Sequence, residues 1–178
     1  SGIATLTAEY VKEVQGTNAA ISDTRKTVPG LRVLDKYAVS IGGGRNHRMN
    51  LTDGVLIKDN HLAALQKEGF DLVQTIKRAR SKAPHTVKIE VEVETIEAAV
   101  VAANVGADIV MLDNMSPEDM ATAVDKIATN CVVEASGGIT LENVASVAQS
   151  GVDIISIGAL THSARAMDIS LDYEPNVN

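Results

Sequence analysis

The chain has 178 residues, of which 45% are hydrophobic, 22% charged and 2% aromatic, a composition that predicts one globular domain with an aliphatic core. The net charge of −7, the absence of tryptophan and the lack of a basic surface argue against nucleic-acid binding. Charged residues interrupt every apolar run, so neither a membrane span nor a secretory signal is expected. Cys131 is the only cysteine, which excludes an internal disulfide and favours a cytoplasmic protein.

Short β-branched runs alternate with longer helical patterns along the chain. These patterns predict strands at residues 21–24, 54–57, 87–93, 108–112, 131–135 and 153–157, and helices at 5–15, 59–66, 70–82, 95–104, 117–128 and 141–150. Gly106 and Gly151 each lie between a predicted helix and the next strand, the usual position of a helix C-cap. The order predicts about six βα units in an α/β fold, either a doubly wound sheet or an incomplete TIM-like barrel.

Strand 87–93 favours the barrel. Lys88, Glu90, Glu92 and Glu94 alternate with aliphatic residues, so one face of this strand is polar, whereas strands covered by helices on both faces are usually continuously apolar. A barrel interior can accept such a face, and an edge strand with one solvated face is the alternative. We expect an open, incomplete TIM-like (β/α) barrel with about six to seven parallel strands.

Cations concentrate in the first third of the chain. Residues 1–60 hold eight basic and six acidic side chains, whereas residues 61–178 hold eight and seventeen. Most of the candidate cations lie at or just after predicted strand ends, where convergent charges suit a small polycarboxylate or a phosphate. This cationic set consists of Arg25, Lys26, His47, Arg48 and Lys58. Three further early cations, Arg32, Lys36 and Arg45, are interpreted as solvated surface charges.

Two carboxylates, Glu92 and Asp113, lie at the exits of neighbouring predicted strands. They could hold Mg²⁺ through oxygen ligands and water, accept ribose hydroxyls or stabilise a developing positive charge. Pairing with Lys58 or Lys88 is the structural alternative and is compatible with these roles.

Glycine-rich exits follow the last two predicted strands. Ser136, Gly137, Gly138 and Gly158 precede helical segments, the arrangement of the phosphate site in the final loops of such barrels, although plain turn geometry also accounts for paired glycines. The triplet 42–44 is a weaker phosphate-loop signal because no strand and helix frame it.

The remaining reactive side chains are given structural roles. Of His61 and His85, one is expected to serve a helix start and the other a loop. Cys131 and the methionines are assigned to packing.

The sequence resembles the nicotinate-nucleotide pyrophosphorylase family, also called quinolinate phosphoribosyltransferase. The resemblance covers nearly the whole chain, and it is carried in order by Ser1-Gly2-Ile3-Ala4-Thr5, Asp23-Thr24-Arg25-Lys26-Thr27, Pro29-Gly30-Leu31-Arg32, Lys36-Tyr37-Ala38-Val39, Gly42-Gly43-Gly44, Asn46-His47-Arg48, Leu56-Ile57-Lys58-Asp59-Asn60-His61, Glu90-Val91-Glu92, Met111-Leu112-Asp113-Asn114, Glu134-Ala135-Ser136-Gly137-Gly138-Ile139 and Gly158-Ala159-Leu160-Thr161-His162-Ser163.

This resemblance implies a pentosyltransferase of NAD biosynthesis that joins quinolinate to 5-phosphoribosyl 1-pyrophosphate and releases nicotinate mononucleotide, pyrophosphate and CO₂, with Mg²⁺ as cofactor. It implies that the quinolinate-binding cations are Arg25, Lys26, His47 and Arg48, that Lys58 lies near the phosphoribosyl donor, that the acidic pair is Glu92 and Asp113, and that the phosphate loops contain Ser136, Gly137, Gly138 and Gly158. Catalytic roles are expected for Lys26, Lys58, Glu92 and Asp113, and metal binding for the last two.

Members of the family resemble this chain only after an N-terminal domain of about 100 residues, which implies that residues 1–178 form the barrel domain alone. The resemblance also implies a homodimer or larger homo-oligomer in which that domain sends an arginine into the partner's site. We therefore expect the chain by itself to have little activity. Two alternatives remain open: a Schiff-base aldolase that uses Lys58 or Lys88, and a non-catalytic barrel.

Overall fold

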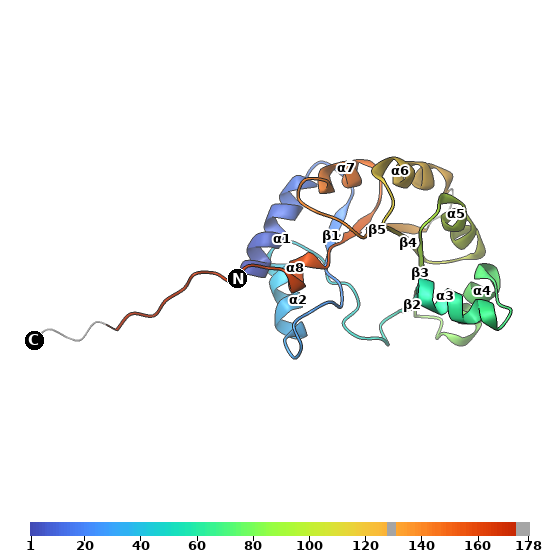
Figure 1. The fold of residues 1–178 in the computed structure, drawn as a ribbon, viewed down its shortest axis with the longest axis horizontal. Coiled ribbons are helices and arrows are strands. Elements are labelled where there is room, and N and C mark those ends of the chain that lie inside the picture. The colour runs from blue at the N-terminus through green and yellow to red at the C-terminus, as the bar shows by residue number, and fades with distance from the viewer. Residues whose placement is uncertain (128–130, 174–178) are drawn as a thin grey trace, which may run out of the picture.

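A computed structural model describes residues 1–127 and 131–173 of the chain. Its centre is one parallel sheet with the strand order β1-β6-β5-β4-β3-β2, in which β1 and β2 are the two edges and do not pair with each other (Figure 1). The strands are β1 (Ala20–Ser22), β2 (Val55–Ile57), β3 (Ile89–Val93), β4 (Ile109–Asp113), β5 (Val132–Ser136) and β6 (Ile154–Ser156). The expected α/β fold with an open, incomplete barrel is confirmed.

Helices form the outer layer of the arc that the sheet describes (Figure 1). They are α1 (Gly2–Glu13), α2 (Arg32–Ile41), α3 (Asp59–Lys67), α4 (Leu72–Lys82), α5 (Ile96–Val105), α6 (Pro117–Lys126), α7 (Val144–Gln149) and α8 (Ala159–His162). The six predicted helices are found, and the last residue of the helix predicted at 117–128 lies outside the described residues. Thr95 caps the start of α5 and left-handed Gly106 its end, as the glycine position predicted.

The alternation in β3 separates two environments. Ile89, Val91 and Val93 belong to the apolar core, whereas Glu90 contacts His47 on the opposite side of the strand. Because β3 pairs with both β2 and β4, the alternative of an edge strand is wrong.

Helix α2, which sequence reasoning missed, has an inverted surface. Asp35 and Lys36 are buried, while its large apolar residues Leu34, Tyr37 and Ile41 are more than 60% exposed. Its apolar residues still follow a helical spacing, but most of them face outward while Asp35 and Lys36 face the core, so the usual environment of each face is reversed.

The segment between α2 and β2 crosses the open side of the arc (Figure 1). It begins with glycines packed against α1: a Cβ at Gly42 would lie 2.6 Å from that of Thr7, and one at Gly44 would lie 2.8 Å from Cγ2 of Thr7. Arg45 then pairs with β1 through its backbone, its N–H donating to the carbonyl of Ile21 at 2.8 Å. The glycine triplet thus permits close packing of this segment against α1.

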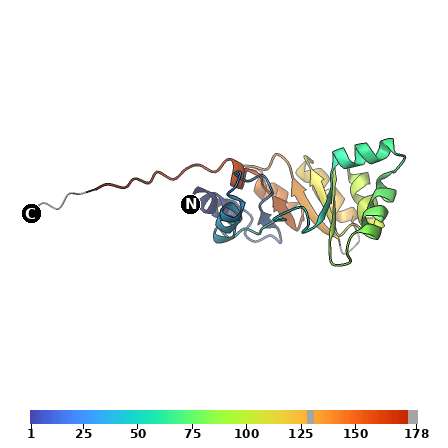
Figure 2. The same ribbon diagram turned by 90° about the horizontal axis from the view of Figure 1, so that it is seen from below.

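At the other end of the chain, residues 164–173 extend away from the body without helix or strand (Figure 2). Residues 174–178 lie outside the described part. No helix among the described residues has the length and apolarity that crossing a membrane requires.

Candidate active site

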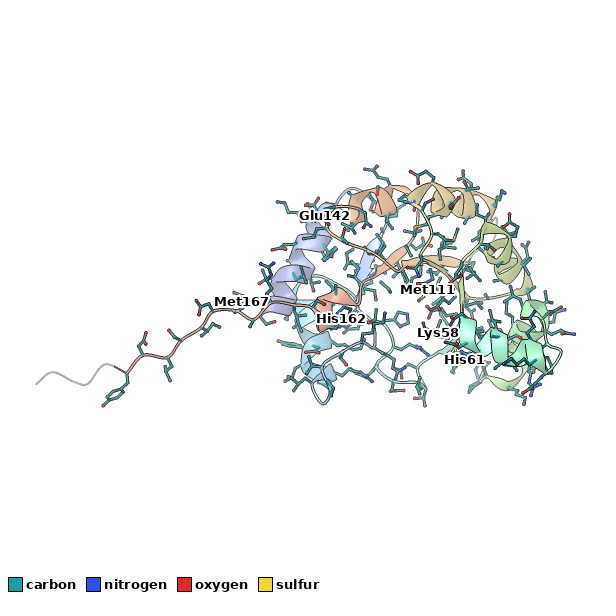
Figure 3. The ribbon with its side chains drawn as sticks, in the orientation of Figure 1. Lys58, His61, Met111, Glu142, His162 and Met167 are labelled. Carbon is teal, nitrogen blue, oxygen red and sulfur yellow. The ribbon has the colours of Figure 1, made fainter. Side chains whose placement is uncertain are left out.

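A cavity of about 310 Å³ lies at the carboxyl ends of the strands. Figure 3 shows Lys58 and Met111, two of its lining residues, on the inner side of the arc. The cavity is lined by Thr24, Arg25, Lys26, His47, Arg48, Leu56, Lys58, Met111, Ser136 and Ser156. All five members of the predicted cationic set line this cavity, and Met111 contributes to its wall as well as to packing.

Two arginines of this cavity hold unpaired donors. Among the described residues, the only buried side-chain nitrogen or oxygen atoms without a hydrogen-bond partner are Nε of Arg25 and Nε of Arg48. Arg48 does use Nη1, which donates to the carbonyl of Gly54 at 2.9 Å. A buried donor without a partner is unfavourable, and two charged ones in one cavity indicate a site for an anion.

A buried ion pair fixes the backbone of His47. Lys36 pairs with Asp23, whose Oδ1 also accepts the backbone N–H of His47 at 2.8 Å, while Lys36 Nζ donates to the His47 carbonyl at 3.0 Å. Asn46 Nδ2 completes the network by donating to Oδ2 of Asp23 at 2.7 Å. The interpretation of Lys36 as a solvated charge is wrong, because its side chain is 1% exposed and anchors the loop that carries His47.

Two buried carboxylates hold the ring of His47. Its Nε2 lies 3.3 Å from Oε2 of Glu90 and 3.5 Å from Oε1 of Glu134, and Ser156 donates its hydroxyl to Glu134. Burial lowers the pKa of His47, but the hydrogen bonds and charges of Glu134 and Glu90 outweigh it and raise the pKa to about 9. The three groups have ligand atoms within 4.8 Å of one another, close enough to share a cation.

A second cavity of about 250 Å³ lies on the opposite side of this carboxylate layer. Its wall includes Val55, Ile109 and Ile154 at the amino ends of their strands, and it shares His47 and Arg48 with the first cavity. The layer formed by His47, Glu90 and Glu134 therefore separates two parts of the barrel interior.

The acidic pair lies at the ends of β3 and β4. Glu92 pairs with Lys58, whose side chain is 47% exposed, as the structural alternative allowed. Asp113 aligns with the lining residue Ser136 in the β4–β5 register, and its Oδ2 accepts from Asn114 at 2.7 Å. Both carboxylates therefore border the cavity, although neither belongs to the residues that line it.

The glycine-rich exits have tightly constrained backbones. Gly137 and Gly138 adopt positive φ values of 85° and 62°, and a Cβ at Gly137 would lie 2.3 Å from Oδ1 of Asn114. Gly158 precedes the four-residue helix α8, and a Cβ there would lie 3.2 Å from Cδ of Lys26. These loops thus come close to the cationic cavity, while their phosphate-binding role remains a prediction.

We expect Gly137→Ala to destabilise the fold by ~1–3 kcal/mol through left-handed strain, and to move the loop because of the contact with Asn114. The matched control is Gly69→Ala, which imposes a similar φ of 86° with no atom within 4 Å of the new Cβ. Urea unfolding of both variants checks this. Equal losses would show that the contact between Gly137 and Asn114 does not matter.

His61, His85 and Cys131 lie outside the cationic cavity. His61 accepts the backbone N–H of Lys58 at 3.0 Å at the start of α3, and His85 lies in a turn, as expected. Burial raises the pKa of Cys131 to about 11, which agrees with a packing role.

Two early arginines behave differently from each other. Arg45 is exposed as expected. Arg32 is not a simple solvated charge, because it donates to Thr27 at 3.1 Å and to the carbonyls of Met49 and Arg25 at 3.1 and 3.2 Å. Among the methionines, Met49 and Met167 are exposed rather than packed.

Sequence reasoning missed the residues that support the cavity from below. The missed residues are Asn46, Glu134 and Ser156. The ion pair of Lys36 and the contact of Glu90 with His47 were missed as well. Only Glu90 had a usable signal, since the alternation of β3 already placed it on the inner face.

The parallel sheet forms an open barrel of the TIM type, with polar groups and clustered cations at the carboxyl ends of its strands, where sites of this fold class lie. Residues 3–172 match the family described as quinolinate phosphoribosyl transferase, C-terminal domain, and the chain belongs to this family.

Relatives and solved structures agree with this assignment. The chain is 48% identical to a probable nicotinate-nucleotide pyrophosphorylase [carboxylating] of Bacillus subtilis and 46% identical to the enzyme of that name from Mycobacterium leprae, over 97% of this chain and 58% and 60% of those proteins. The crystal structure of nicotinate-nucleotide pyrophosphorylase from Ehrlichia chaffeensis matches with a TM-score of 0.91 and 44% identity, covering 98% of this chain and 62% of that one. The chain thus spans about three fifths of the length of these proteins.

Proposed function

We propose that this chain carries the substrate site of a phosphoribosyltransferase that converts quinolinate and 5-phosphoribosyl 1-pyrophosphate into nicotinate mononucleotide, pyrophosphate and CO₂. The observation that carries the proposal is the pair of buried, unpartnered Nε donors of Arg25 and Arg48 inside a cavity with three further cations. The names of the relatives support the choice of this reaction.

The charge of the cavity suits a dicarboxylate. Quinolinate has two carboxylates beside its ring nitrogen, whereas a monocarboxylate would leave part of the cationic set uncompensated. Arg25, Lys26, His47 and Arg48 are proposed to bind the acid, and Lys58, at the end of β2, to face the phosphoribosyl donor. The phosphates are proposed to lie against the backbone amides around Ser136, Gly137, Gly138 and Gly158.

The reaction would proceed by two bond exchanges. The lone pair of the pyridine nitrogen attacks ribose C1 while the bond from C1 to the pyrophosphate oxygen breaks, and the pyrophosphate keeps that electron pair. Positive charge develops on the sugar, which Glu92 and Asp113 would stabilise. The alkylated ring is an electron sink, so the adjacent carboxylate leaves as CO₂ and a proton then replaces it on the ring.

Mg²⁺ is proposed as the cofactor, and the donor groups present fit it. Glu92 and Asp113 end adjacent strands and offer carboxylate oxygens, the ligands that Mg²⁺ prefers, either directly or through water. When bound, the ion would neutralise charge on the departing pyrophosphate. Lys58 and Asn114, which contact these carboxylates, orient them toward the cavity side of the sheet.

Calorimetry with quinolinate and nicotinate tests the proposed ligand. Because nicotinate lacks the second carboxylate and its charge-assisted hydrogen bonds, we expect quinolinate to bind roughly 10- to 100-fold more tightly. Equal affinities for the two acids would contradict the proposal that the cation cluster recognises a dicarboxylate.

The acidic pair should act on turnover rather than on acid binding. We expect Glu92→Gln and Asp113→Asn to leave the affinity for quinolinate nearly unchanged and to lower turnover by about 10²–10³, the range for losing one group that stabilises transition-state charge. Parallel calorimetry and product assays separate the two effects. A fall in thermal stability large enough to unfold both variants would instead assign these carboxylates a structural role.

The Schiff-base aldolase alternative is less favoured by the site. Such an enzyme needs a desolvated neutral amine, whereas Lys58 is half-exposed and pairs with Glu92. Reduction with borohydride in the presence of a carbonyl substrate should leave the mass of the chain unchanged, and a covalent adduct would favour the aldolase.

We further propose a cytoplasmic homodimer. The half-buried single cysteine is compatible with a reducing compartment, and the exposed apolar face of α2, formed by Val33, Leu34, Tyr37 and Ile41, is a surface that a partner would cover. Sedimentation of the wild type and of a Tyr37→Glu variant checks the dimer.

A further inference from the structure

Both ring nitrogens of His47 have partners on the protein. Nδ1 accepts the backbone N–H of Arg48 at 2.8 Å, so the ring hydrogen of Nε2 points to Glu90 and Glu134 on the other side. The ring therefore does not direct Nε2 to a substrate. Its contribution to an anion in the cavity must come from its charge and from its fixed position.

We propose that Glu134 is a positioning residue that keeps His47 positively charged and holds its ring in the wall of the cationic cavity, with Glu90 as its second support. This inference rests on the proposed function, because the positive charge of His47 contributes to binding only if the cavity accepts an anionic substrate. It assigns a role in the site to a β5 residue that does not itself line the cavity.

Burial shows which member of the charge pair between His47 and the two glutamates faces the cavity. The His47 side chain is 13% exposed, whereas those of Glu90 and Glu134 are 4% and 1% exposed. His47 thus lies between the cavity and the carboxylates, and a substrate meets the positive end of the pair. Ser156 fixes the Glu134 carboxylate by donating its hydroxyl, and β5 and β6 hold both residues in the sheet.

The environment of His47 contains charges of both signs. The groups that face it are Glu90 from β3, Glu134 from β5, Asp23 after β1, Arg25 and Lys26 in the following loop, Arg48 beside it, Lys58 after β2, and Arg45, Asp53 and Lys88 around the second cavity. Of these, only the two buried carboxylates come within hydrogen-bond or ion-pair distance of the ring, so they dominate its protonation.

One contact opposes the charged ring. A second proton on Nδ1 would remove the bond from the Arg48 N–H, since both groups would then be donors. A hydrogen bond between ionised groups is roughly twice as strong as a neutral one, and two carboxylates oppose a single neutral donor. Glu134 and Glu90 are the groups that raise the pKa of His47 to about 9, and the titration midpoint of the ring shows directly whether they outweigh the Arg48 contact.

Nuclear magnetic resonance of the chain labelled with ¹⁵N-histidine tests the proposal. A His47→Gln variant assigns the His47 signals among those of the four histidines. The wild-type ring should titrate near pH 9, and Glu134→Gln should lower its midpoint by about 1–3 pH units, the effect of removing one close opposite charge. Glu118→Gln, which removes an exposed carboxylate on α6, is the matched control and should leave the midpoint unchanged.

Calorimetry with quinolinate across the same pH range links the charge to binding. In Glu134→Gln, affinity should fall ~10-fold as pH rises through the lowered midpoint, whereas the wild type should keep its affinity up to about pH 8; one pKa unit corresponds to such a factor. Glu134→Asp, which retains a carboxylate, should restore part of the wild-type profile.

Three results would overturn the inference. They are a wild-type His47 midpoint near its ordinary value of about 6.5, a midpoint that is the same in Glu134→Gln and wild type, and a pH profile of binding that Glu134→Gln does not change. The first needs no Glu134 variant, so the test survives if Glu134→Gln does not fold. The His47 midpoint could be high in the wild type and fall in Glu134→Gln while the chain does not bind quinolinate. That result would support the control of the His47 charge by Glu134 and would overturn only the proposed function.

Discussion

Arg48→Ala should weaken quinolinate binding by ~2–5 kcal/mol, the effect of removing one partner of a buried charge-assisted pair. Arg48 lines the cavity, its Nη1 is already anchored to the carbonyl of Gly54 at 2.9 Å, and its buried Nε has no partner on the protein among the described residues. The anchored guanidinium is therefore preorganised for a carboxylate, and its loss leaves one substrate charge uncompensated.

Calorimetry with quinolinate and with 5-phosphoribosyl 1-pyrophosphate measures this effect, and we expect the donor affinity to change far less. Arg45→Ala is the matched control, because Arg45 is exposed and borders only the second cavity. Unchanged quinolinate affinity in Arg48→Ala, or an equal loss in Arg45→Ala, would show that Arg48 does not bind the acid.

Lys36→Met should lower the free energy of unfolding by ~3–5 kcal/mol, because it leaves the carboxylate of Asp23 buried without its charge partner. Asp23 is fully buried, and its remaining contacts, the His47 N–H and the Asn46 amide, are neutral donors. The double variant Asp23→Asn/Lys36→Met removes both charges and should recover much of this loss, because the main cost of removing one member of a buried pair is the unpaired charge that stays behind.

Urea unfolding of the two single variants and the double variant gives the coupling free energy. The exposed pair of Arg80 and Asp108, whose side chains are 41% and 34% accessible, provides the comparison. Arg80→Ala should lose no more than about 1 kcal/mol. A Lys36→Met variant as stable as Arg80→Ala would contradict the anchoring role of the buried pair.

Most of the fold was accessible from the sequence because parallel βα units leave a strong local pattern. The alternation of Glu90 and Glu92 with buried aliphatic residues separated the barrel interior from the helix-facing side, and Gly106 marked a helix end that the structure confirms. The same reasoning grouped five cations, with all but His47 and Arg48 near strand ends, and the structure brings all five into one cavity.

The support beneath the cavity was not accessible for a physical reason. Lys36 lies on α2, which turns Asp35 and Lys36 toward the core. A rule that places lysine at the surface therefore predicts the wrong environment for it. The contact of Glu134 with His47 joins β5 to a loop more than eighty residues earlier, and no local pattern in the chain encodes that distance.

The central claim is that this cationic cavity accepts quinolinate for phosphoribosyl transfer. Incubating the chain with carboxyl-labelled quinolinate and following labelled CO₂ tests it most directly, with 5-phosphoribosyl 1-pyrophosphate present or omitted. We expect release of CO₂ and pyrophosphate in equal amounts, dependent on the donor and on Mg²⁺ and strongly reduced in Arg48→Ala, even if turnover is slow. Labelled CO₂ that appears without the donor, or at the same rate in Arg48→Ala, would contradict the claim.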